Sequence, residues 1–158
     1  MNDVRARPNR LPWPPIIFLA AIAVSVFLNA FYPLPWFAQP LSGILSAIGW
    51  LMIAAFVALN ISAVRTMRRA GTTVRPDRGT DHLVTEGPFS FTRNPLYLAG
   101  TILVLGIGLV SGIVWFLLLA VLAAFAVQKL AIEREERHLQ ARFGKTYMDY
   151  AERVRRWI

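Results

Sequence analysis

The chain has 158 residues, of which 56% are hydrophobic, and it contains no cysteine. This apolar fraction exceeds the roughly 45–50% that is usual in water-soluble domains, and it excludes intrinsic disorder, because disordered chains lack apolar side chains. Without cysteine there is no disulfide scaffold, zinc–thiolate site or cysteine nucleophile. The net charge of +8 is typical of proteins that bind nucleic acid or a membrane surface.

The positions of the basic residues favour the membrane. Residues 11–64 and 94–128 contain no Lys or Arg, whereas three basic residues lie in 5–10, six in 65–93 and eight in 129–156. Long uncharged apolar blocks between basic segments predict membrane helices. The same layout argues against a nucleic-acid partner, which needs a basic patch on a soluble domain.

Four transmembrane helices follow from the apolar runs. Residues 14–32 and 43–64 are each close to the roughly 20 residues that cross a bilayer. The uncharged run 96–127 would be about 48 Å long as one helix, so we expect a tight hairpin of helices 95–111 and 112–131. Four small residues in the first of these helices would let helices approach closely in lipid, namely Ala99, Gly100, Gly106 and Gly108.

The predicted fold is therefore one all-α integral membrane domain over residues 1–158. A cytoplasmic loop (65–94) and C-terminal amphipathic helices (132–158) would form a pocket at one end. Four crossings place both termini and every Lys and Arg on one side, which the positive-inside rule makes cytoplasmic. We expect this membrane to be the inner or plasma membrane of a prokaryote.

The segment that opens the third apolar helix is the first candidate site. Asn94 is a good N-cap and Pro95 suits the first helical turn. A helix N-terminus beside Arg93 also attracts an anion, with Tyr97 one turn further along the helix. Both interpretations, a plain helix start and an anion site, stay open on these residues alone.

The helix after Lys129 places two carboxylates beside an apolar stripe. At helical spacing Ile132, Leu139 and Phe143 share one face, and Glu135 and Glu136 flank it. A carboxylate near an apolar seam needs a cationic partner or a ligand; Arg93 or a cationic ligand would serve. The alternative is a solvated helix with ordinary i,i+4 ion pairs.

A second apolar stripe runs through residues 147–158: Tyr147, Tyr150, Ala151, Val154 and Ile158. It predicts an amphipathic helix that anchors on the cytoplasmic surface or covers a site at the interface. His82 and His138, the two histidines, lack the spacing of a metal site. No Gly-rich dinucleotide motif follows a strand pattern.

Together these segments resemble the isoprenylcysteine carboxyl methyltransferase family and, more loosely, the membrane phospholipid N-methyltransferases. The resemblance is carried by residues 83–98 (LVTEGPFSFTRNPLYL), the hydrophobic hairpin, residues 135–139 (EERHL) and residues 143–150 (FGKTYMDY). It covers about residues 70–156. The first 64 residues match only as generic membrane helices.

The resemblance implies S-adenosylmethionine as cofactor at the cytoplasmic face and a lipophilic methyl acceptor. The implied cofactor-binding residues are Asp81, His82, Leu83, Val84, Phe89, Asn94, Pro95, Leu96, Tyr97, Glu135 and Glu136. The chemistry of the helix N-terminus adds Arg93, as a partner for the cofactor carboxylate. No catalytic acid, base or nucleophile is assigned, because positioning two reactants supplies much of the rate of a displacement.

Two positions depart from the eukaryotic carboxyl methyltransferases, which have His in place of Asn94 and a substrate-binding Arg in place of Ala131. A carboxylate, an amine and a thiol therefore all stay open as acceptors.

Two other functions also stay open. One is an NADPH-dependent membrane reductase on a related scaffold, because residues 65–78 contain five Arg. The other is a non-enzymatic membrane protein.

Overall fold

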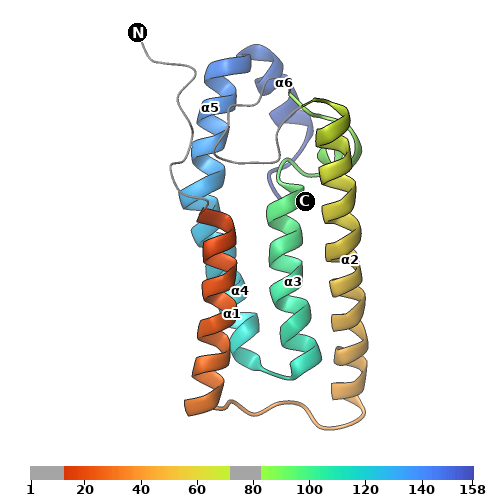
Figure 1. Ribbon diagram of the computed structural model, residues 1–158, viewed down its shortest axis with the longest axis vertical. Helices are drawn as coiled ribbons and strands as arrows, with labels where there is room; N and C mark the ends of the chain where they lie inside the picture. The colour runs from red at the N-terminus through yellow and green to blue at the C-terminus, as the bar shows by residue number, and fades with distance from the viewer. Residues whose placement is uncertain (1–12, 72–82) are drawn as a thin grey trace.

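The computed structural model describes residues 13–71 and 83–158. Figure 1 shows a long helical bundle with a smaller helical layer at one end. The elements are α1 (Trp13–Phe31), α2 (Leu41–Arg69), η1 (Gly87–Ser90), α3 (Pro95–Ser111), α4 (Val114–Val127), η2 (Gln128–Ile132), α5 (Glu133–Phe143) and α6 (Lys145–Arg153). The described residues contain no strand, which confirms the all-α prediction for this part of the chain.

Three helices are long and apolar enough to cross a membrane. They are α1, α2 and the continuous helix Val114–Phe143, which joins α4, η2 and α5. Large apolar side chains on their outer surfaces are exposed, including Leu51, which is 70% exposed. Such a surface suits lipid rather than water, so this is an integral membrane protein. The apolar helix α3 has 17 residues, the lower limit for a crossing, and the count of four crossings stays a prediction.

Small residues bring the helices together. An added Cβ atom on Gly49 of α2 would lie 2.8 Å from the carbonyl oxygen of Gly106 in α3, and one on Gly100 would lie 2.5 Å from the Phe18 ring of α1. Lipid tails give little hydrophobic drive for helix association, so close backbone contact stabilises such pairs. The predicted packing role of the small residues in α3 is confirmed.

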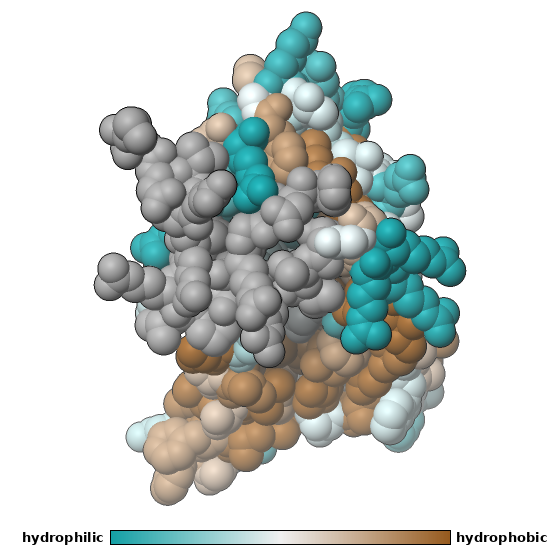
Figure 2. Space-filling model, turned by 45° about the horizontal axis from the view of Figure 1, so that its top comes forward, coloured by the Kyte–Doolittle hydropathy of each residue, from teal (hydrophilic) through white to brown (hydrophobic). Residues whose placement is uncertain are grey.

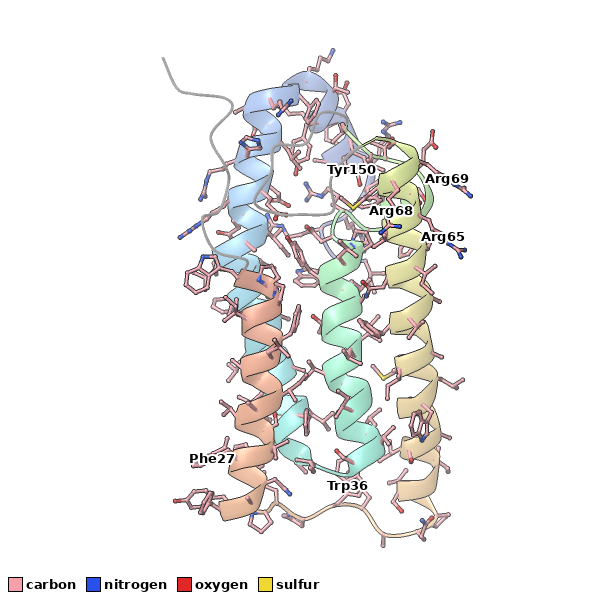
Figure 3. The ribbon with its side chains drawn as sticks, viewed as in Figure 1. Phe27, Trp36, Arg65, Arg68, Arg69 and Tyr150 are labelled. Carbon is pink, nitrogen blue, oxygen red and sulfur yellow. The ribbon has the colours of Figure 1, made fainter. Side chains whose placement is uncertain are left out.

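The chain reverses between α3 and α4 at Gly112, where φ is 69°. This left-handed conformation favours glycine, and the Gly112 N–H donates to the Gly108 carbonyl at 2.9 Å. At the same end, Trp36 (Figure 3) lies against Gly112, and the Trp115 indole donates to the Tyr32 carbonyl at 2.7 Å. Indole rings of this kind suit the interface between lipid and water.

Two helix ends differ from the sequence prediction. The helix α2 begins at Leu41 and continues past Val64 to Arg69, so the first arginines of the predicted loop 65–94 are helical. At the other end, α6 stops at Arg153 and Val154 is extended. The predicted helical stripe therefore does not reach Ile158, which is 74% exposed.

The described basic residues all gather at one end of the bundle. They lie at the end of α2, before the start of α3, and in η2, α5, α6 and the last residues. Figure 2 shows hydrophilic side chains around this end and an apolar surface below it. The connection 32–40 and the turn at Gly112, at the opposite end in Figure 1, carry no charge. We call the end of the bundle that holds the basic residues the charged end.

Candidate functional site

A cavity of about 130 Å³ lies at the charged end. Its walls come from the end of α2, the segment 83–94, α5 and α6. The lining residues are Met67, Leu83, Val84, Phe89, Arg93, Asn94, Glu135, Glu136, Leu139, Tyr147 and Tyr150. The cavity therefore combines apolar and aromatic walls with two acidic groups and one basic group.

Seven of the residues expected to bind a cofactor line this cavity: Leu83, Val84, Phe89, Arg93, Asn94, Glu135 and Glu136. Three more, Pro95, Leu96 and Tyr97, form the first turn of α3 directly behind Asn94. The remaining two, Asp81 and His82, lie outside the described residues. Residues separated by some fifty positions in sequence are thus brought to one place.

A π-helical turn aims the two glutamates at the cavity. The buried face of α4 runs through Phe116, Ala120, Ala123 and Val127, and in an uninterrupted α-helix Arg134 would continue it. The wider turn of η2 accommodates one extra residue, and this moves Glu135 to the inward face. Residue Arg134 is exposed. Single π-helical turns of this kind frequently occur at functional sites.

The Glu135 carboxylate contacts the first turn of α3. The Tyr97 hydroxyl donates a hydrogen bond to Glu135 Oε1 at 2.5 Å. Because a carboxylate offers about four lone-pair positions, Glu135 retains the capacity to accept from a further donor inside the cavity.

The neighbouring Glu136 carboxylate is held by two arginines. The Arg156 guanidinium donates to both oxygens, with Nε to Oε1 at 2.9 Å and Nη2 to Oε2 at 2.6 Å. The Arg93 Nη2 lies 3.4 Å from Glu136 Oε1. Paired, two-point contacts of this kind are among the stronger hydrogen bonds in proteins. One of the cationic partners considered from the sequence, Arg93, is therefore present, and it pairs with Glu136.

The Arg93 side chain has a hydrogen-bond donor that is not used. Its Nη1 donates to the Tyr147 hydroxyl at 3.2 Å, whereas its buried Nε has no hydrogen-bond partner among the described residues. Burial and the nearby Glu136 carboxylate raise the pKa of the Tyr147 phenol, although Arg93 opposes them. The Tyr147 hydroxyl is therefore neutral. The buried Arg93 Nε–H, which has no partner among the described residues, is suited to bind an anionic ligand.

The last residues of the chain hold the loop that carries Arg93. The Arg93 N–H donates to the Arg155 carbonyl at 3.0 Å, and the Asn94 amide donates to the Arg156 carbonyl at 2.9 Å. The N-cap prediction for Asn94 is therefore wrong for its side chain, which makes no capping hydrogen bond to α3. On the same loop the Phe89 carbonyl accepts from the Tyr150 hydroxyl at 2.6 Å.

The helix α6 covers the cavity. Its apolar residues Tyr147 and Tyr150, with Val154 beyond it, are buried against Leu83 and Leu139. Of the two interpretations of this stripe, the cover over a site agrees with this packing and the surface anchor does not. Both tyrosines belong to the stripe that the sequence revealed, whereas Met67 and Arg156 gave no sequence signal.

The sequence profile of a family described as phospholipid methyltransferase matches residues 44–146. The match spans well over half of the chain and includes every lining residue up to Leu139. The chain belongs to the phospholipid methyltransferase family. The resemblance to membrane methyltransferases that residues 83–98 and 135–150 carried is confirmed.

The chain is also similar to one curated protein, the nickel-cobalt-cadmium resistance protein NccN of Alcaligenes xylosoxydans xylosoxydans. The two are 39% identical over 78 residues, which are 49% of this chain and 36% of that protein. The chain thus matches about a third of the length of this relative. No solved structure matches the chain.

The described residues contain no group of three or more acidic or His side chains that could hold a metal ion.

Proposed function

We propose that this protein transfers a methyl group from S-adenosylmethionine to a lipophilic acceptor at the cytoplasmic face of a membrane. The observation that carries the proposal is the cavity at the charged end, where Glu135, the free N–H of Arg93 and apolar walls converge. Membership of a family of membrane methyltransferases supports it.

The residues present fit this cofactor. S-adenosylmethionine carries an ammonium and a sulfonium group, a carboxylate, ribose hydroxyls and a flat adenine ring. The carboxylate of Glu135 suits the ammonium group or a ribose hydroxyl, and the Arg93 Nε–H suits the carboxylate. The walls formed by Leu83, Phe89 and Leu139 suit the adenine ring.

When bound, the cofactor supplies an activated methyl carbon. The protein's own residues would bind and orient both reactants and keep water out of the cavity. Correct placement of two reactants accounts for a large part of the rate of such a displacement. We therefore assign binding and positioning roles to the cavity residues and no covalent role to any of them.

The apolar surface of the bundle favours an acceptor that arrives from the bilayer. A carboxylate, an amine and a thiol acceptor remain candidates. At the position of the substrate-binding Arg of the carboxyl methyltransferases, Ala131 is buried beside Val127 and Ile132. A cation is therefore missing where those enzymes hold the carboxylate of their substrate, and this disfavours the same acceptor here.

The proposal is tested by calorimetric titration of detergent-purified protein with S-adenosylmethionine. We expect saturable binding that weakens about tenfold or more in Glu135→Ala, because a charge-assisted contact contributes about 1.5–3 kcal/mol. The matched control is Glu133→Ala, on the same helix, where the carboxylate pairs with Lys129 at 2.6 Å and does not line the cavity.

Two outcomes would contradict the proposal. Folded wild-type protein that does not bind S-adenosylmethionine would remove the methyltransferase function, and NADPH titrated into the same sample would then test the reductase alternative. Equal affinity in wild-type protein and Glu135→Ala would leave the cofactor in place but move its site away from this cavity.

A further inference from the structure

We propose that Arg156 is a positioning residue, and that the C-terminal tail (residues 154–158) is a latch that holds Arg93 in place to bind the carboxylate of the cofactor. The inference rests on the proposed function and deepens it, because it assigns different roles to the two adjacent glutamates. Glu136 belongs to the latch, and Glu135 is the acidic group that binds the cofactor.

The backbone of the tail is the first part of the latch. Two consecutive carbonyls accept three hydrogen bonds from the loop before α3. The Arg155 carbonyl accepts from the Arg93 N–H at 3.0 Å. The Arg156 carbonyl accepts from the Asn94 amide at 2.9 Å and from the Thr92 hydroxyl at 3.2 Å. Because Thr92 and Asn94 are buried, losing these acceptors would leave polar groups without partners.

The side chain of Arg156 is the second part. It binds both oxygens of Glu136, and Glu136 in turn lies 3.4 Å from Arg93 Nη2. The Glu136 carboxylate is therefore shared between two cations. Without Arg156, Arg93 would be the remaining cationic partner of Glu136. The Glu136 carboxylate would then compete with the carboxylate of a ligand for the Arg93 guanidinium.

The tail has its own anchor, which fixes the two carbonyls. The Trp157 indole donates to Gln128 Oε1 at 2.8 Å, and its ring packs on Val127, Ala131 and Ile132. The residue Gln128 opens the π-helical turn. The tail therefore contacts both the loop that carries Arg93 and the turn that aims Glu135. In Arg156→Gln the Trp157 anchor on that turn stays in place.

The decisive probe is a ligand that lacks the carboxylate. Calorimetry with Arg156→Gln should show about a tenfold loss of affinity for S-adenosylmethionine. The affinity for decarboxylated S-adenosylmethionine should stay within about twofold of the wild-type value, because that ligand has no group for Arg93. A merely structural defect would weaken both ligands alike and would overturn the inference.

Two variants keep the test interpretable. In Arg153→Gln an exposed arginine of α6 changes, which donates to the Asp149 carbonyl at 3.1 Å and neither belongs to the tail nor lines the cavity, so both affinities should equal those of the wild type. In the exchange Glu136→Arg with Arg156→Glu, the ion pair is restored in reverse, but the carboxylate beside Arg93 is replaced by a cation. Affinity for S-adenosylmethionine should therefore stay low; full recovery would overturn the role of Glu136.

Hydrogen exchange tests the latch without any ligand. In Arg156→Gln the amides of residues 89–97 should exchange several-fold faster than in the wild type, and those of α2 should not change. Unchanged exchange in residues 89–97 would overturn the inference. Faster exchange in a protein that binds no S-adenosylmethionine would retain the latch and reject the proposed function, so the two failures are distinguishable.

Discussion

At the scale of single residues, two adjacent glutamates have different surroundings. The Glu136 carboxylate is neutralised by Arg93 and Arg156, whereas Glu135 contacts only a neutral hydroxyl donor, that of Tyr97, among the hydrogen bonds described for it. A charge that is already paired gains little from a cationic ligand, and one that is not paired gains more. Adjacent side chains of the same type are therefore suited to different tasks.

The buried hydroxyl of Tyr150 gives a prediction that does not depend on the cofactor. Burial raises the pKa of this phenol above its ordinary value, with Arg93 opposing and Tyr147 assisting. The unfolded chain would release this proton near pH 10, while the folded protein retains it. Stability should therefore be lost as the pH rises above about 10.

We expect Tyr150→Phe to be about 1 kcal/mol less stable at neutral pH, because the hydrogen bond to the Phe89 carbonyl is lost. Its stability should also decline less steeply at alkaline pH, since Phe cannot ionise. Thermal unfolding of both proteins in detergent between about pH 8 and pH 11 measures the two slopes. Parallel curves would contradict the assignment of a raised pKa to Tyr150.

The sequence revealed the polar groups of the site better than it revealed their partners. The helical spacing of residues 132–143 indicated that Glu135 and Glu136 flank an apolar seam, and the structure places both on the cavity. It did not indicate Arg156, because that residue reaches Glu136 from an extended tail with no periodic pattern. Contacts that depend on how a tail folds back cannot be obtained from the spacing within one element.

At the scale of elements, the helix Val114–Phe143 combines a membrane segment with a site segment. The uncharged run in its first half predicted α4, and the charged amphipathic pattern in its second half predicted α5. The π-helical turn between them could not be predicted, because the sequence Gln128–Ile132 is an ordinary helical sequence. The extra residue of the π-helical turn becomes evident only when the buried face of α4 is compared with that of α5 in the structure.

The contact between α2 and α3 predicts a steric effect. An added methyl group on Gly49 would lie 2.8 Å from the Gly106 carbonyl oxygen and 2.9 Å from Leu109 Cβ. Overpacking of this kind costs about 1–3 kcal/mol, more than the roughly 1 kcal/mol that alanine gains over glycine in a helix. We expect Gly49→Ala to lower the midpoint of thermal unfolding in detergent.

The matched control for Gly49 lies in the first turn of the same helix. An added methyl group on Gly43 would meet only the side-chain amide of Gln39, at 3.0 Å, and that flexible group is able to move. Thermal unfolding of Gly43→Ala should therefore be unchanged or slightly raised. A loss of stability in both variants would point to a general intolerance of α2 rather than to its contact with α3.

At the scale of the whole molecule, the distribution of charge and the length of α2 both indicate that one end of the bundle lies outside the hydrocarbon core. The described basic residues lie at the end that holds the cavity, and the opposite connections carry no charge. The helix α2, with 29 residues, is about 43 Å long and exceeds a hydrocarbon core of about 30 Å. Its last turns, with Arg65 and Arg69 pointing away from the bundle (Figure 3), therefore extend into the headgroup region.

This arrangement predicts four crossings with both termini and the cavity in the cytoplasm. The chain has no cysteine, so single cysteines can report the side of the membrane on which a residue lies. We expect Gln39→Cys and Ser111→Cys, both at exposed positions, to react with a membrane-impermeant maleimide in intact bacterial cells that produce the protein. The exposed Lys145→Cys should react only after the membrane is opened.

The Ser111 position decides whether the 17-residue helix α3 crosses the bilayer. If α3 and α4 entered and left on the cytoplasmic side, Ser111→Cys would stay unlabelled in intact cells while Gln39→Cys reacted. Labelling of Lys145→Cys in intact cells would instead reverse the orientation, and it would place the cavity on the side where S-adenosylmethionine is not made. The labelling pattern of these three positions therefore tests the topology and the access of the proposed cofactor together, because a positive-inside orientation and binding of cytoplasmic S-adenosylmethionine require the same side.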